Sequence, residues 1–168
     1  MFSKGDVIFH TSAGICQIDD IRQENFTGEL RQYYVMHPVN HNGRSVIYVP
    51  VDAKKSPIRN VLSEEEINEV IINSINENIE WIDNNNLRKA SFNEILHSDN
   101  ISRIIALISV LHKRKESVIN NGKKMPVVDE RIMNDAEKKV HEEFSYALDI
   151  NEDEVPSYII SQMQMANC

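Results

Sequence analysis

The sequence has few of the residues that form disulfide frameworks, metal clusters or repetitive structures. Its two cysteines, Cys16 and Cys168, lie near opposite ends of the 168 residues, a spacing typical of neither a metal motif nor a disulfide scaffold. Only five glycines and five prolines occur, which excludes collagen-like and low-complexity architectures. Such sparse cysteine is typical of a protein in a reducing compartment.

Long apolar runs are also missing. No segment approaches the roughly 20 consecutive apolar residues that a transmembrane helix requires. The opening residues Met1–Val7 contain no apolar stretch of the kind that a secretory signal needs. We therefore expect a protein that stays in the cytoplasm and has no membrane among its partners.

Catalytic motifs are absent as well. The chain has no glycine-rich phosphate loop, no Gly-x-Ser-x-Gly and no His-Glu-x-x-His. A zinc site built from His10, His37, His41 and Cys16 would lack the close ligand pairs of metal motifs. We expect no enzyme, no cofactor and no metal, and a metal-dependent enzyme is only a remote alternative.

Positive charge is scarce and unevenly distributed. The chain has 18 Lys and Arg against 26 Asp and Glu, a net charge of −8 that argues against general nucleic-acid binding. Residues 63–83 contain seven acids and no base, and residues 129–168 contain three bases against ten acids. Residues 84–128 are the one strongly basic segment, with eight bases against three acids. Any DNA contact is therefore predicted to be local and weak.

The first sixty residues are predicted to form a small antiparallel β domain. Their apolar residues are mostly β-branched or aromatic and are interrupted by turn signals at Thr27-Gly28 and Asn42-Gly43. Short antiparallel strands without a helix can bury a common apolar face by curling into a barrel. The predicted strands are Val7–His10, Ile15–Ile21, Arg31–Met36 and Ser45–Val49, and residues 52–60 are predicted to be a linker.

The apolar spacing becomes helical from residue 61, which predicts a second, all-α domain over residues 61–168 and hence a two-domain α+β protein. Ser63 and Glu66 have the spacing of a capping box. Ser98 or Asp99 is expected to cap the third helix, whose nearly all-apolar start predicts a central position. Helices are predicted over residues 64–75, 87–96, 101–116 and 129–148, with a last one after an acidic capping segment at 149–154.

Trp81 is the only tryptophan, and it stands among polar residues at the start of the basic segment. One interpretation is an ordinary residue packed between helices, since tryptophan is highly buried on average. The other is an aromatic ring offered to a nucleic acid beside cations that bind phosphates. Residue patterns alone do not decide between the two.

Several short motifs, in their order, resemble the CarD family of bacterial transcription regulators. The resemblance extends over essentially the whole chain, through a helical segment that begins near the lone tryptophan and ends in an amphipathic helix. The motifs are Phe2-x-Lys4-Gly5-Asp6-x-Ile8-x-His10, Gly14-Ile15, Tyr34-Val35, Val49-Pro50 and Leu111-x-Lys113-Arg114.

This resemblance implies an N-terminal Tudor-like barrel that binds the β subunit of RNA polymerase and is related to a module of the transcription-repair coupling factor. It also implies a helical domain that contacts promoter DNA, where a tryptophan wedges into the minor groove at the upstream edge of the bubble and stabilises the open complex. The implied polymerase-binding residues are Arg22, Glu24, Phe26 and Tyr48, and the implied DNA-binding residues are Trp81, Arg88, Lys89, Lys124 and Arg131.

The chain departs from the family pattern at both implied interfaces. Residues 82–85, directly after the tryptophan, carry no base, although well-known members are basic there. Glu24 and Tyr48 stand where other members have arginines at the polymerase contact. We expect a monomeric, non-catalytic regulator whose DNA contact depends on polymerase, and the alternative is a polymerase- or protein-binding adaptor that does not contact DNA.

Overall fold

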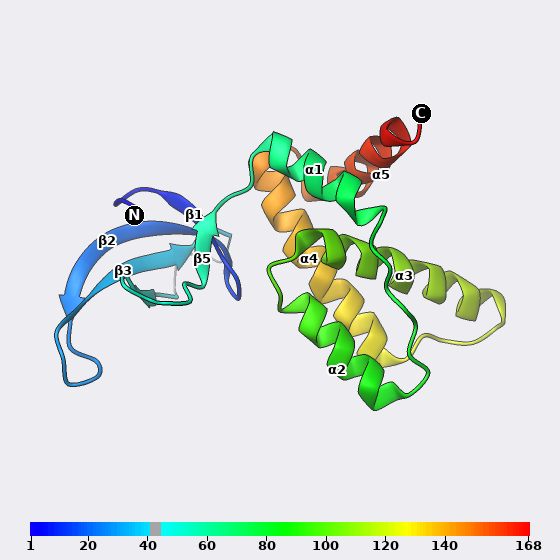
Figure 1. Ribbon diagram of the computed structural model, residues 1–168, viewed down its shortest axis with the longest axis horizontal. Coiled ribbons are helices and arrows are strands. Elements are labelled where there is room, and N and C mark those ends of the chain that lie inside the picture. Colours follow the sequence, from blue (N-terminus) through cyan, green and yellow to red (C-terminus); the bar gives the residue numbers. More distant parts are fainter. Residues whose placement is uncertain (41–44) are drawn as a thin grey trace. The chain divides into compact units, whose positions relative to one another are not determined.

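The computed structural model describes residues 1–40 and 45–168, which divide into two compact units, Met1–Val61 and Leu62–Cys168 (Figure 1). The first unit is an antiparallel sheet, and the second consists of helices. This confirms the predicted α+β class. The hairpin predicted at Asn42-Gly43 lies outside the described residues.

The sheet has five strands in the order β4-β3-β2-β1-β5, so that β4 and β5 lie at its two ends. Residues 52–60 were predicted to be a linker, but their last three residues form β5 and pair with β1. This prediction was wrong because three residues with one buried isoleucine carry too little pattern to indicate a strand. The strands are β1 Val7–His10, β2 Gly14–Glu24, β3 Arg31–Pro38, β4 Ile47–Pro50 and β5 Ile58–Asn60.

The long strands β2 and β3 pair along most of their length (Figure 1), and their side chains alternate between the two faces of the sheet. The pairing between them shifts at Asp19, where a β-bulge adds one residue to β2. One face holds the core of this unit. The opposite face includes Tyr33 and Val35, since side chains alternate along a strand. The core residues are Ile8, Cys16, Ile18, Tyr34, Met36, Val49 and Ile58.

The helical unit begins at the predicted capping box. The Ser63 amide donates to the Glu66 carboxylate at 2.8 Å, and the Glu66 amide donates to the Ser63 hydroxyl at 3.2 Å. The cap of the third helix is Asn100, in place of the predicted Ser98 or Asp99. The helices are α1 Glu64–Ser74, α2 Asn85–Leu96, α3 Ile101–Asn120, α4 Val127–Leu148 and α5 Val155–Ala166, with a 3-10 turn η1 at Glu152–Glu154.

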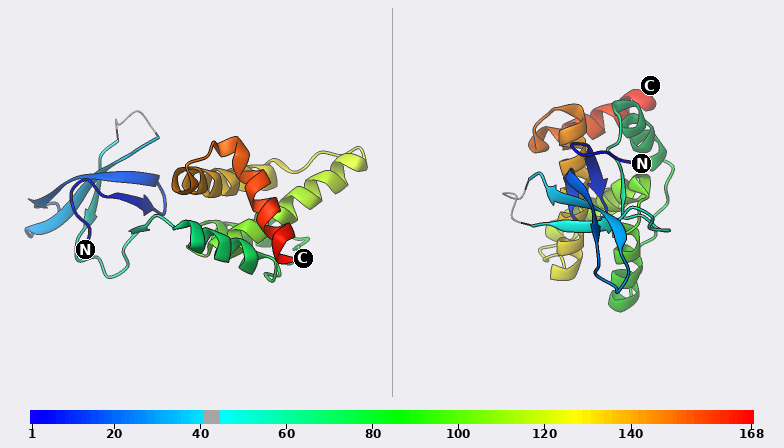
Figure 2. Two further views of the ribbon diagram at one scale, coloured as in Figure 1. Left: turned by 90° about the horizontal axis from the view of Figure 1, so that it is seen from above. Right: turned by 90° about the vertical axis from the view of Figure 1, so that its left-hand side faces the viewer.

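Helix α3 is the centre of this unit, as its apolar sequence predicts. It packs against α1, α2 and α4, while α1 also packs against α5 (Figure 2). Ile104, Leu107 and Leu111 of α3 are completely buried. In residues 1–40 and 45–168, no helix is both long enough and apolar enough to cross a bilayer.

The end of α4 provides a test of this fold. Asp149 adopts a left-handed conformation with φ 53°, which favours glycine, and its carboxylate lies at the negative end of the helix dipole. Asp149→Gly should therefore stabilise the helical unit by about 1 kcal/mol, raising its melting temperature by about 2–4 °C in a thermal melt.

Asp153→Gly is the matched control. Asp153 lies inside η1, and all the described non-glycine residues apart from Asp149 have negative φ, so glycine there adds backbone entropy without relieving strain. Its melting temperature should fall. A lower melting temperature for Asp149→Gly would contradict the strained-cap argument.

Candidate functional site

Three aromatic rings form a cluster on the sheet. Phe26 lies in the turn between β2 and β3, Tyr33 in β3 and Tyr48 in β4. The Phe26 centroid lies 5.1 Å from that of Tyr33 and 5.0 Å from that of Tyr48, and both pairs are edge-to-face. The register explains the contact, because Val35 pairs with Tyr48 and Tyr33 is two residues from Val35. We call these three rings the aromatic cluster.

One ring of the aromatic cluster is buried in the protein, and the other two are exposed to solvent. Tyr33 is 5% exposed, whereas Phe26 and Tyr48 expose 57% and 38% of their surface. Leu30, in the same turn as Phe26, is also exposed. Large apolar side chains gathered on a surface are typical of a protein-binding site, since a folded chain otherwise tends to cover them.

Charged side chains of β2 accompany the cluster. Arg22 is the cross-strand partner of Tyr33, and Glu24 is the partner of Arg31, so both share the face of the cluster. Arg22 makes a half-exposed ion pair with Asp20 at 3.5 Å. The structure thus places the four predicted polymerase-binding residues on one face. It adds Tyr33, which residue patterns alone did not identify because its neighbours depend on strand register.

Trp81 is partly buried against the helical core. Its ring meets Phe92 of α2 edge-to-face, with centroids 5.8 Å apart. Two guanidinium groups lie over the indole: that of Arg88 at 4.5 Å from the ring centroid and that of Arg114 at 4.7 Å. The ring therefore combines features of both sequence interpretations, since it packs on the core and lies beside cations.

Arg88 holds the segment that follows Trp81. Its Nε and one terminal nitrogen donate to the two carboxylate oxygens of Asp129, at 3.1 and 2.8 Å. The other terminal nitrogen donates to the carbonyls of Ile82 and Asp83, at 2.8 and 3.3 Å. A final bond, of 2.8 Å, reaches the side chain of Asn85. We call this network the Arg88 clamp.

The clamp argues against the phosphate contact predicted for Arg88. A guanidinium has five N–H donors, and the five bonds of the clamp use all of them. Arg88 is 4% exposed and Asp129 is 1% exposed. To bind a phosphate, Arg88 would have to release the Asp129 carboxylate. Arg88 therefore acts inside the helical unit, where it holds the residues that follow Trp81.

Other cations remain available at the surface. Lys89 and Lys124 are exposed, and Arg131 makes only a loose, exposed contact of 4.0 Å with Asp135. Arg114 was not among the predicted DNA-binding residues, yet it lies over the Trp81 ring from an exposed position on α3. Its signal in the sequence was the basic run that ends the apolar part of α3.

Two of the three histidines considered for zinc, His10 and His37, have other contacts. The Nδ1 of His10 accepts the amides of Ser12 and Ala13, each at 3.1 Å, and so stabilises the turn after β1. His37 pairs with Asp19 at 2.8 Å, and His41 lies outside the described residues. Among the residues that the structure describes, no three histidine, cysteine or acidic side chains gather as metal ligands do.

The unit that contains the sheet matches a protein-family model. Residues 2–62 match the CarD-like/TRCF RID domain, a range that ends where the helical unit begins. A comparison with curated proteins gives no match. Residues 2–62 of the chain therefore belong to the CarD-like/TRCF RID domain family, as the resemblance to the CarD family predicts.

Proposed function

We propose that the protein is a transcription regulator that binds the β subunit of RNA polymerase through its N-terminal domain and stabilises the promoter open complex through Trp81. The domain match supports a transcription-related function involving RNA polymerase. The observation that carries the proposal is the exposed aromatic cluster on the matched domain. The proposed function includes no catalytic step and no cofactor.

The aromatic cluster supplies the chemistry of a protein contact. Phe26 and Tyr48 are held by edge-to-face packing with Tyr33, so little side-chain freedom remains to be lost on binding. Aromatic residues and arginine dominate the binding energy of protein interfaces, while charges at the rim select the partner. We propose this face of a Tudor-like barrel as the contact with the β subunit, with Arg22 and Glu24 at its rim.

Phe26→Ser tests the polymerase contact in the full chain. Removing an exposed anchor ring should weaken binding to RNA polymerase about tenfold or more, the usual loss at an interface hot spot. Affinity for immobilised polymerase measures this effect. The control is Val127→Ser, which alters a side chain that is 80% exposed in the helical unit and should leave binding unchanged. Equal binding of Phe26→Ser and the unaltered protein would place the interface elsewhere.

The proposed DNA contact is weak because few cations lie near Trp81. Trp81 is accompanied by exposed Arg114 and Lys89 in a protein whose net charge is −8, so only a few phosphates can be neutralised. A polymerase-bound protein presents these groups at a high effective concentration, which makes a weak contact sufficient. Insertion of a ring between bases costs a few kcal/mol of unstacking, and this cost is smallest at the edge of a melted bubble.

Trp81→Ala tests the DNA contact. We expect shorter-lived open complexes, measured by competitor challenge on a promoter, with unchanged binding to polymerase. Because the ring is only partly buried, the free energy of unfolding should fall by about 1–3 kcal/mol, less than for a fully buried aromatic residue. Ile72→Ala on α1, a 43% exposed position, is the control and should leave the lifetime unchanged. A stability loss with an unaltered open-complex lifetime would refute the DNA role.

We also propose that the Arg88 clamp positions Trp81 for this contact. The clamp fixes the two carbonyls directly after Trp81 and contacts the ring itself. Lysine cannot reproduce this fork of five donors. Trp81 is the only tryptophan, so intrinsic fluorescence reports on this position alone.

Arg88→Lys should therefore shift the Trp81 emission to longer wavelength and increase its quenching by acrylamide. Loss of one partner from a buried ion pair costs about 3–5 kcal/mol, so a stability control is necessary. The double variant Arg88→Met with Asp129→Leu replaces the pair by apolar side chains, which often keeps stability. It should fold and still show the displaced tryptophan. Unaltered emission in both variants would show that the clamp does not position the ring.

Two observations favour an alternative function in which the protein does not contact DNA. Residues 82–85 carry no base, and the clamp holds Arg88 inside the protein, so fewer cations surround Trp81 than the family resemblance implies. These features favour an adaptor that binds polymerase or another protein without contacting DNA. The Trp81→Ala experiment distinguishes the two functions, because only the first predicts a change in open-complex lifetime.

A further inference from the structure

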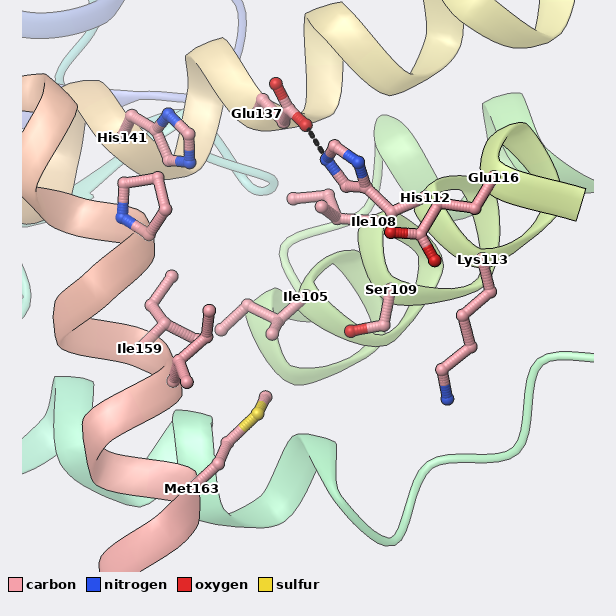
Figure 3. Close-up of a pocket in the computed structure, with 12 residues that line it drawn as sticks. Ile105, Ile108, Ser109, His112, Lys113, Glu116, Glu137, His141, Ile159 and Met163 are labelled. Atoms are coloured by element: carbon pink, nitrogen blue, oxygen red, sulfur yellow. Dashed lines mark hydrogen bonds and ion pairs between the residues drawn. The ribbon is translucent and has the colours of Figure 1, made fainter. Parts of the chain in front are cut away.

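A cavity of 510 Å³ lies between α3, α4 and α5, on residues to which neither proposed interface assigns a role (Figure 3). Its wall on α3 runs from Ile105 to Glu116, about 16 Å at the helical rise of 1.5 Å per residue. Helix α5 forms the facing wall, while α4 contributes Glu137 and His141. The cavity is open to the surface and is accessible to a molecule from solution.

The size of the cavity is that of a small-molecule site. Such sites usually measure roughly 300–1,000 Å³. A chain of about eight carbon atoms fits the available length and volume.

One part of the cavity is aliphatic. Ile105 and Ile108 of α3 face Ile159 and Met163 of α5, and Figure 3 shows these side chains directed into the same space. Pro156 completes this part of the lining. Such a surface gains free energy by burying an apolar chain, and methionine adapts to different shapes.

The other part is polar and carries net negative charge. Glu137 pairs with His112, and Glu116 has no partner in the described part of the chain. Burial lowers the pKa of His141, so its imidazole is neutral at pH 7 and offers a hydrogen-bond acceptor. The only lysine of the lining, Lys113, extends away from Glu137 and His141 (Figure 3).

We propose that this cavity binds an organic ammonium ion with an aliphatic body, its cationic head beside Glu137 and His141 of α4 and its body along the isoleucines. The carboxylate of Glu137 supplies charge complementarity, and the neutral imidazole accepts a hydrogen bond from an N–H. A carboxylate head would be repelled by Glu137, and an alcohol would gain no ionic attraction. This site does not depend on polymerase or DNA binding.

The test compares three probes with the same eight-carbon chain: n-octylammonium, 1-octanol and octanoate. Calorimetric titration of the full chain at pH 7 should show saturable binding of octylammonium, with octanol and octanoate each at least about tenfold weaker. A tenfold ratio corresponds to about 1.4 kcal/mol, the low end for one charge-assisted hydrogen bond. Octanoate binding equal to octylammonium, or no binding of any probe, would overturn the proposal.

Variants locate the site. Glu137→Gln should weaken octylammonium about tenfold and leave octanol unchanged, and circular dichroism would check the fold because Glu137 also pairs with His112. Glu116→Gln, at an exposed position one helical turn beyond His112, should weaken octylammonium less than Glu137→Gln does. Met163→Ser should weaken octylammonium and octanol alike. Glu94→Gln on α2, outside the cavity, is the matched control for general attraction to an acidic protein, and an equal effect of this variant would refute the site.

Discussion

One buried ion pair, between Arg88 and Asp129, joins two helices of the helical unit. These charges lie 41 positions apart in sequence, and taking them out of water costs several kcal/mol each unless every polar atom finds a partner. The structure meets that condition. Arg88 donates two hydrogen bonds to the Asp129 carboxylate, two to the backbone carbonyls of Ile82 and Asp83, and one to the side chain of Asn85. The pair therefore joins α2 to the start of α4 and fixes the residues directly after Trp81. The proposed positioning of the single tryptophan rests on this network.

The distribution of charge separates the two proposed contacts. The aromatic cluster on the sheet offers apolar area with a few rim charges, which suits a protein surface. Two cations, Arg88 and Arg114, lie beside Trp81, but Arg88 is paired with the buried carboxylate of Asp129. The predicted DNA contact is weak because the protein as a whole is acidic, with a net charge of −8. Attachment to a larger partner is the physical condition under which so acidic a chain can use this segment on DNA.

Local patterns predicted what local interactions determine. The strand β1 and the capping box at Ser63 and Glu66 follow from neighbouring residues, and the structure has both. The burial of Arg88, which argues against its predicted phosphate contact, was not foreseen because it depends on Asp129, whose proximity no local pattern indicates. The contact of Tyr33 with Phe26 and Tyr48 was not foreseen because only the strand register brings these rings together. The cavity on α3 was not predicted for the same reason, since its lining joins three helices that are separated in sequence.

The partial burial of Trp81 is consistent with a role in recognition. A free ring would lose rotational freedom on insertion between bases, whereas a ring already held by Phe92 and by Arg88 loses less. Arg114 lies over the same ring from an exposed position on α3, and in the proposed DNA contact it would be the cation beside the indole. A completely buried tryptophan would have no surface to offer, and a completely exposed one would have no fixed direction. The Arg88 clamp holds the backbone directly after a ring that is only partly buried, and the proposed DNA contact rests on this combination.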